Sequence, residues 1–146
     1  MSIFSNEQHS LMRGKLTQAI KDFSYRFKRY DVNYSMAMGH SPENIDMSPL
    51  SQHIRETDRF IVLNHNTCVV IFDCANDEAG TKAANNMLTR FEGTFFSTPL
   101  FTSIVTASNY ENVSLMMDEL FYLLNYAIQH NMKNILMGHS QVIQKQ

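Results

Sequence analysis

The chain has 146 residues, of which 44% are apolar and 18% are charged, and its formal net charge is −2. This length and composition are typical of one globular domain with a core of its own. They exclude a membrane partner, because no apolar run approaches the roughly 20 residues that span a bilayer. The first five residues become polar too soon for a signal peptide, so we expect a cytoplasmic protein.

Basic residues concentrate near the N-terminus. Residues 1–30 hold six of the twelve Lys and Arg and only two of the fourteen acids, which makes this segment +4 and the remainder −6. Such asymmetry can indicate nucleic acid or an acidic partner. The segment has no basic run and no interleaved aromatic residues for stacking on bases, so we expect no nucleic-acid partner.

Residues 1–30 predict an N-terminal amphipathic helix that packs on or precedes the domain. Ser5 followed by Gln8 is a capping box that opens it. Two interpretations of the apolar side stay open: it covers the chain's own sheet, or it binds a second copy as a dimerisation or signal-input helix. Both rest on a heptad seam formed by Leu16, Ile20, Phe23, Phe27 and Tyr30.

Residues 31–146 predict a single domain organised around a β-hairpin at residues 60–72. Two apolar, β-branched arms flank the polar tip Asn64-His65-Asn66-Thr67. Because both arms are apolar at nearly every position, we expect both strands at the centre of the sheet, buried on both faces.

The other elements follow from apolar periodicity and turn chemistry, and they alternate as strands and helices around the hairpin. The predicted architecture is therefore α/β (α+β), a mixed sheet flanked by helices. The predicted elements are a strand at 33–38 ended by a turn at 39–42, a short helix at 48–56 capped by Ser48, a helix from Asn76 or Asp77 to Arg90 stopped by Gly93, a strand at 101–106, a helix at 112–130, a strand at 134–137 and a frayed end at 141–146.

Two cysteines, Cys68 and Cys74, lie in or beside the second arm of the hairpin. Six residues apart on a strand, they face one side but are too distant to form a disulfide. We therefore predict two reduced core thiols.

The tetrapeptide Arg55-Glu56-Thr57-Asp58, followed by the hairpin, resembles the core of the GGDEF family, the diguanylate cyclases. In that family an R-x-x-D element precedes the hairpin, and the tip begins six residues after its Asp, which is Asn64 here. Residues 101–104 look like the family's fourth major strand, and residues 120–134 are similar to its terminal helix and the segment after it. The resemblance covers residues 30 to 138 and implies a nucleotide-cyclase or ferredoxin-like fold.

The sequence departs from the family pattern at the positions that hold magnesium and nucleotide in family members. Family members hold magnesium with one carboxylate on the first strand and one at the tip. Here residues 35–39 contain no acid, and Asn66 and Thr67 stand where acids are expected. Asn64 and His65 replace two glycines that let nucleotide approach the backbone. The segment from 37 to 58 is also too short for the family's two helices. Because magnesium requires anionic oxygen, we expect no cyclase activity and no cofactor.

The R-x-x-D element remains a candidate ligand site. In active family members it binds cyclic di-GMP as a product-inhibition site, and some degenerate members keep it and act as receptors. Arg55 has the fork that grips phosphate or guanine, and Asp58 can accept from a guanine edge. The alternative is structural: the two residues pair with each other and cap the helix–strand junction.

Other chemistry has weaker support. His40, His53 and His65 invite a zinc hypothesis, but no ligand spacing typical of zinc sites occurs, so we expect no metal site. No nucleophile motif of a hydrolase occurs either. The first hypothesis is thus a catalytically inactive, degenerate GGDEF-like signalling module that acts through protein contacts, with a homodimer through the N-terminal helix as one form. The second is a receptor that binds cyclic di-GMP or another nucleotide through Arg55 and Asp58.

Overall fold

The computed structural model describes residues 3–95 and 98–139. Its centre is a mixed sheet of β1 (Tyr34–His40), β2 (Arg59–Asn64), β3 (Thr67–Asp73), β4 (Phe101–Thr106) and β5 (Leu136–Met137), in the order β2-β3-β1-β4-β5. This confirms the predicted class, a mixed sheet flanked by helices. In the described part of the chain, no helix has both the length and the apolar character needed to cross a membrane.

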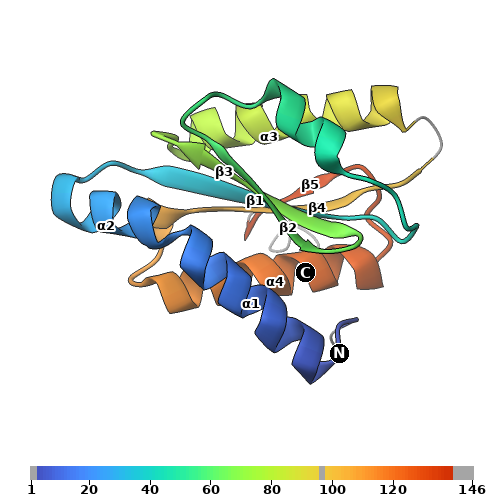
Figure 1. Ribbon diagram of the computed structural model, residues 1–146, viewed down its shortest axis with the longest axis horizontal. Coiled ribbons are helices and arrows are strands. Elements are labelled where there is room, and N and C mark those ends of the chain that lie inside the picture. The colour runs from blue at the N-terminus through green and yellow to red at the C-terminus, as the bar shows by residue number, and fades with distance from the viewer. Residues whose placement is uncertain (1–2, 96–97, 140–146) are drawn as a thin grey trace.

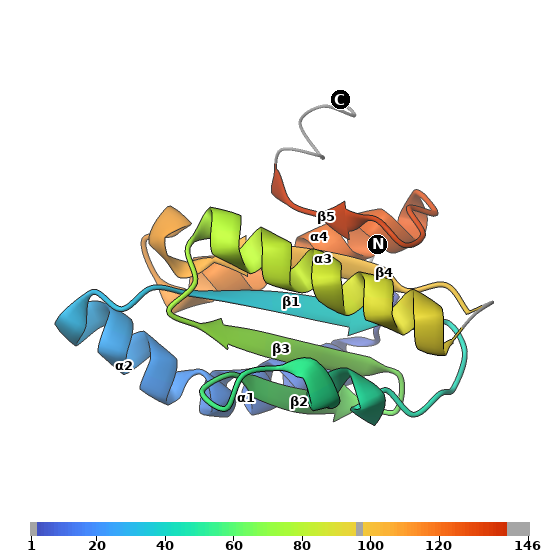
Figure 2. The ribbon, with the colours of Figure 1, turned by 90° about the horizontal axis from the view of Figure 1, so that it is seen from above.

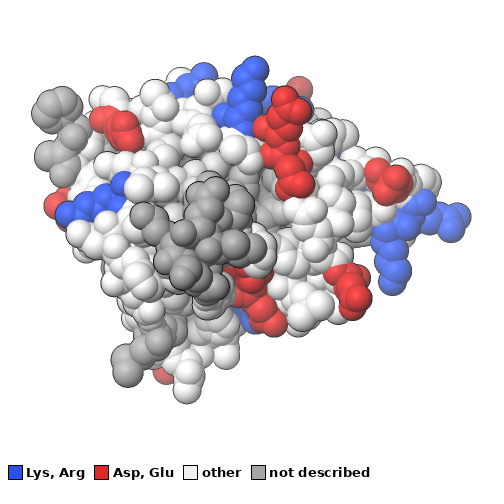
Figure 3. Space-filling model, turned by 180° about the vertical axis from the view of Figure 1, so that it is seen from behind, with Lys and Arg blue, Asp and Glu red and all other residues white. Residues whose placement is uncertain are grey.

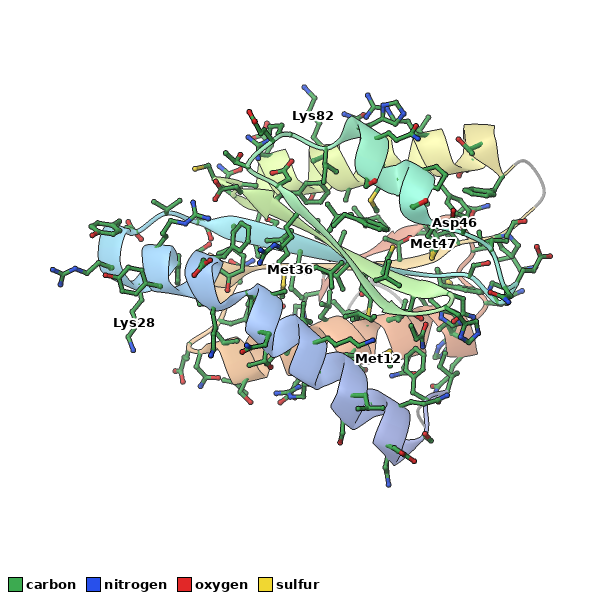
Figure 4. All side chains as sticks on the ribbon, viewed as in Figure 1. Met12, Lys28, Met36, Asp46, Met47 and Lys82 are labelled. Atoms are coloured by element: carbon green, nitrogen blue, oxygen red, sulfur yellow. The ribbon has the colours of Figure 1, made fainter. Side chains whose placement is uncertain are left out.

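Helices cover both faces of the sheet (Figure 1). On one face lie α3 (Asp77–Thr94) and the short 3-10 helix η1 (Ser48–His53). On the other lie α1 (Asn6–Ala19), α2 (Lys21–Tyr30) and α4 (Val113–Gln129). Each face therefore has its own core. Met12 and Met36 belong to the core under α1 and α4, whereas Met47 belongs to the core beside η1 (Figure 4).

The hairpin forms at the predicted residues, but only one of its strands is central. β3 pairs with both β1 and β2 and is buried at every position. β2 is an edge strand, seen at one side of the sheet in Figure 2, and Val62 on it is 53% exposed. The prediction that both arms are buried was therefore wrong for β2. The reason is the strand order, which gives β2 a neighbouring strand on one side only.

The N-terminal segment forms two helices rather than one. Ser5 and Gln8 make the predicted capping box of α1. The helix ends at Ala19, and Ile20 separates it from α2. Most of the heptad seam packs on the chain's own sheet, as the first of the two interpretations predicts. Leu16, Ile20 and Phe23 are buried in the core, Phe27 packs against it, and Tyr30 is 64% exposed.

Several boundaries differ from the prediction. Gly39 and His40 continue β1 instead of forming a turn, because both pair with β3 and β4. Met47, not Ser48, precedes η1, and no side chain caps that helix. Gly93 does not stop the helix as predicted. It has no positive φ and lies within α3, which ends at Thr94. The strand at 101–106 is confirmed, and the helix predicted at 112–130 forms as α4, with Asn112 as its cap. The predicted frayed end at 141–146 lies outside the described residues.

Candidate functional site

The tip of the hairpin is a compact turn whose amide groups bond within the fold. The backbone N–H of Asn66 donates to Oδ1 of Asn64 at 3.1 Å. The Asn66 side chain donates to the carbonyl of Ser41 at 2.7 Å, and the Ser41 N–H donates back to the Asn66 carbonyl at 3.0 Å. Lys15 on α1 donates to the carbonyl of Leu63 at 3.0 Å, so a cation stands beside the tip.

His40 fills the corner between the end of β1 and the tip. Its Nδ1 lies 2.8 Å from Oγ1 of Thr67, and its ring packs edge-on against Phe4. Burial, and secondarily the charge of His65, lowers the pKa of His40 to about 4. The imidazole is therefore neutral at pH 7. Among the described residues no three His, Cys, Asp or Glu side chains come close enough to hold a metal ion.

Ser35 belongs to the acid-free stretch 35–39 but lies near the start of β1, at the opposite end of that strand from the hairpin tip, because it pairs with Phe72 whereas His40 pairs with Thr67. Ser35 Oγ lies 2.7 Å from Oγ1 of Thr106 and 3.2 Å from the carbonyl of Ala75. Helix α3 approaches this position closely at Gly80. Between β1 and β2 the chain forms only η1, in place of the family's two helices.

The R-x-x-D residues pair with each other before β2. Asp58 Oδ2 accepts from the backbone N–H of Arg55 at 2.9 Å and from its Nε at 3.3 Å, and Oδ1 accepts from its Nη2 at 3.0 Å. Oδ1 also accepts from the backbone N–H of Asp73 at 2.8 Å. The Asp58 side chain is thus only 3% exposed and accepts two bonds on each oxygen at this junction. Accepting from a guanine edge would require one of these bonds to open.

Arg55 keeps donors available on its outer side. Its side chain is 58% exposed, and Nη2 reaches the carbonyl of Asp73 as well as Asp58. A guanidinium carries five N–H donors, and in the described part of the chain the two on Nη1 have no partner. The hydrogen bond to Asp58 raises the pKa of Arg55 above its ordinary value, so the charge is permanent. Arg55 can therefore bind an anion without leaving Asp58.

A cavity of about 200 Å³ lies beside this pair, between η1 and α3. Its wall includes apolar Leu50, Phe72 and Met87, and Arg90 lines it together with Arg55. Nη1 of Arg90 donates to the carbonyl of His53 at 3.3 Å.

The sequence interpretation missed Arg90 and weighed His53 only as a metal ligand. Arg55 and Arg90 are 35 positions apart in the sequence, and no motif joins them. Only the packing of α3 against η1 brings both to one cavity. The structure does not bring His40 and His65 to this place.

Comparison with known proteins finds neither a family model nor a curated protein sequence that matches the chain. Solved structures do match. The GGDEF domain of DgcB from Caulobacter crescentus in complex with c-di-GMP is 6% identical, with 86% of each chain covered and a TM-score of 0.69. The GGDEF domain of YfiN (TpbB) from Pseudomonas aeruginosa is 12% identical, with 92% of this chain and 93% of that chain covered and a TM-score of 0.65.

A third match is a microbial GGDEF domain described in its interaction with cyclic di-GMP. It is 10% identical, with 87% of this chain and 92% of that chain covered and a TM-score of 0.69. Identities this low establish the arrangement of the elements and leave the chemistry to the site residues. The chain therefore has a GGDEF-like fold, as the R-x-x-D element and the hairpin predict.

Proposed function

We propose that this chain is a catalytically inactive GGDEF-like signalling module. The observation that supports this is the chemistry of the tip, where Asn64, Asn66 and Thr67 offer no carboxylate and use their side chains in hydrogen bonds within the fold. Magnesium needs anionic oxygen, and phosphoryl transfer needs the metal to neutralise phosphate charge. The neutral imidazole at the end of β1 and the ammonium of Lys15 offer magnesium no anionic oxygen.

An assay with GTP and magnesium tests this proposal. The purified chain is incubated with both, and cyclic di-GMP is measured by chromatography, with an active GGDEF domain as the positive control. We expect no product above the protein-free blank. Product formation that is lost on Asn66→Ala substitution would overturn the proposal, because it would locate catalysis at the tip.

A second function, a receptor for cyclic di-GMP, is favoured by the cavity beside Arg55. Two guanidinium groups, Arg55 and Arg90, border apolar side chains there, and Arg55 bonds Asp58 through Nε and Nη2 and not through Nη1. Forked guanidinium donors suit phosphate and guanine. A cavity of about 200 Å³ is smaller than typical small-molecule pockets, so it would hold one base while the phosphates stay at the rim.

Calorimetric titration with cyclic di-GMP tests the receptor function. We expect micromolar binding that is abolished by Arg55→Ala and weakened about tenfold by Arg90→Ala, the loss typical of one charge-assisted contact. Arg29→Ala, an exposed arginine on α2, is the control and should bind normally. An affinity unchanged in Arg55→Ala would remove the site from this place.

The protein-contact part of the proposal concerns the outer faces of the helices. Several large apolar side chains are exposed there, which suits a partner or a second copy. On the face in Figure 3 most of the surface is uncharged, and Lys and Arg stand in small groups among Asp and Glu. Light scattering after size exclusion tests self-association, and a strict monomer at high concentration would count against the homodimer. The large apolar side chains exposed on the outer faces of the helices are those of Leu11, Tyr25, Tyr30, Leu115 and Tyr122.

A further inference from the structure

Asp73, the last residue of β3, joins three parts of the molecule. Its backbone N–H donates to Oδ1 of Asp58 at 2.8 Å, and its carbonyl accepts from Nη2 of Arg55. Its carboxylate faces the other way and accepts two bonds from Nη1 of Arg26, at 3.0 and 3.1 Å. One residue therefore holds the R-x-x-D pair with its main chain and helix α2 with its side chain.

The ion pair between Asp73 and Arg26 of α2 is largely shielded from water. The side chain of Asp73 is only 7% exposed and that of Arg26 is 35% exposed, so water screens the pair less than a surface ion pair. The guanidinium of Arg26 also lies over the ring of Phe23, 4.9 Å from its centroid, and Phe23 is buried in the core. Arg26, a residue of α2, thus contacts Phe23 on its own helix and Asp73 on β3.

The position of Arg55 depends on this junction. Apart from Asp58, the hydrogen-bond partner of the Arg55 side chain in the described chain is the Asp73 carbonyl, at the point where β3 ends. The next residue, Cys74, has a positive φ of 53°, a conformation that turns the chain sharply away from the strand. Asp73 thus carries both the carboxylate that Arg26 of α2 binds and the carbonyl that Arg55 binds, at the point where β3 ends.

We propose that Arg26 and Asp73 are positioning residues for the Arg55–Asp58 site, and that they couple helix α2 to a phosphate-bearing ligand there. The ligand part rests on the receptor function proposed above. A ligand bound through Nη1 of Arg55 leaves the contact of Nη2 with Asp73 in place, so it orders this junction further. Coupling is reciprocal: the ligand stabilises docked α2, and docked α2 strengthens ligand binding.

The first experiment needs no ligand. Amide hydrogen exchange of α2 is compared in the wild-type chain, Arg55→Ala and Arg29→Ala. Because Arg55 helps hold Asp73, we expect α2 to exchange at least about threefold faster in Arg55→Ala and at the wild-type rate in Arg29→Ala. Unchanged exchange of α2 in Arg55→Ala would overturn the coupling whatever the ligand affinities are.

The second experiment measures cyclic di-GMP binding by calorimetry. Asp73→Asn and Arg26→Ala should each bind about five- to twentyfold more weakly, within the usual range of coupling between two sites. Arg26→Lys keeps the charge but loses the planar guanidinium that lies over Phe23. It should give an intermediate affinity, and it replaces Arg26→Ala if that variant does not fold. Wild-type affinity in Asp73→Asn and the Arg26 variants would overturn the positioning role. If the wild-type chain binds no cyclic di-GMP, the receptor function fails, and hydrogen exchange alone decides the coupling.

Discussion

Nδ1 of His40 lies 2.8 Å from Oγ1 of Thr67, which joins the last residue of β1 to the first residue of β3. The two residues also face each other in the register of the antiparallel pair. In the GGDEF resemblance this corner belongs to the metal carboxylates of the first strand and the tip. Here it is packed, with Phe4 against the imidazole, and it contributes to stability instead.

The first prediction concerns the pH dependence of stability. The pKa of His40 is about 4 in the folded chain, against 6.5 for a free histidine. Between these values the unfolded chain binds a proton that the folded chain does not. The free energy of unfolding should therefore be highest above pH 6.5 and fall by up to about 3 kcal/mol as the pH drops towards 4. Urea unfolding at pH 4.5, 5.5 and 7.5 measures this loss.

The matched variant for this prediction is His40→Gln, which keeps a polar side chain beside Thr67 but does not titrate. Its stability relative to the wild-type chain should improve as the pH falls, because only the wild-type chain loses the His40 contribution. A constant difference between the two chains from pH 7.5 to 4.5 would contradict the depressed pKa.

The second prediction concerns the contact of α3 with β1. A Cβ added at Gly80 would lie 2.3 Å from Oγ of Ser35, whereas one at Gly93 meets nothing within 4 Å. Gly80→Ala should therefore destabilise the chain by about 1–3 kcal/mol through overpacking, although alanine favours helix. Gly93→Ala on the same helix should stabilise it by up to about 1 kcal/mol. Urea midpoints shifted equally by both variants would contradict the close contact.

The third prediction tests whether the N-terminal helices belong to the domain. Leu16 is fully buried under α1, whereas Leu11 on the same helix is 62% exposed. Leu16→Ala should reduce the free energy of unfolding by about 2–5 kcal/mol, and Leu11→Ala by less than about 0.5 kcal/mol. A small effect of Leu16→Ala in a single cooperative transition would mean that α1 folds apart from the sheet.

The fourth prediction separates the two thiols. Burial raises the pKa of Cys68 to about 12, while Cys74 is exposed just after β3. The prediction of two core thiols was therefore wrong for Cys74. A thiol reagent such as DTNB should react rapidly with one group in the native chain, and the second should react only on unfolding. Cys74→Ser should remove the rapid phase, and a rapid phase that persists in this variant would contradict the burial of Cys68.

Local signals in the sequence were sufficient for the central elements of the fold. The capping box at Ser5, the hairpin at residues 60–72 and the start of a helix at Asn76 depend on residues only a few positions apart, and all three form as predicted. The edge position of β2 could not be predicted in this way. Its apolar residues resemble those of β3, and only strand order distinguishes them.

The candidate site shows the same limit. The pairing of Arg55 with Asp58 follows from their spacing of three residues, and the sequence interpretation offered it as an alternative. The roles of Arg26, Asp73 and Arg90 depend on contacts between distant segments. No periodicity in a single sequence joins residues 26, 55 and 73.

The measurement that tests the central claim most directly is nuclear magnetic resonance of the labelled chain, titrated with cyclic di-GMP and, separately, with GTP and magnesium. The account predicts that cyclic di-GMP shifts amide signals of residues 53–58, 73–74 and 83–90, and that GTP with magnesium leaves residues 39–41 and 64–67 unchanged. Shifts centred on the hairpin tip with GTP and magnesium, accompanied by turnover, would contradict it.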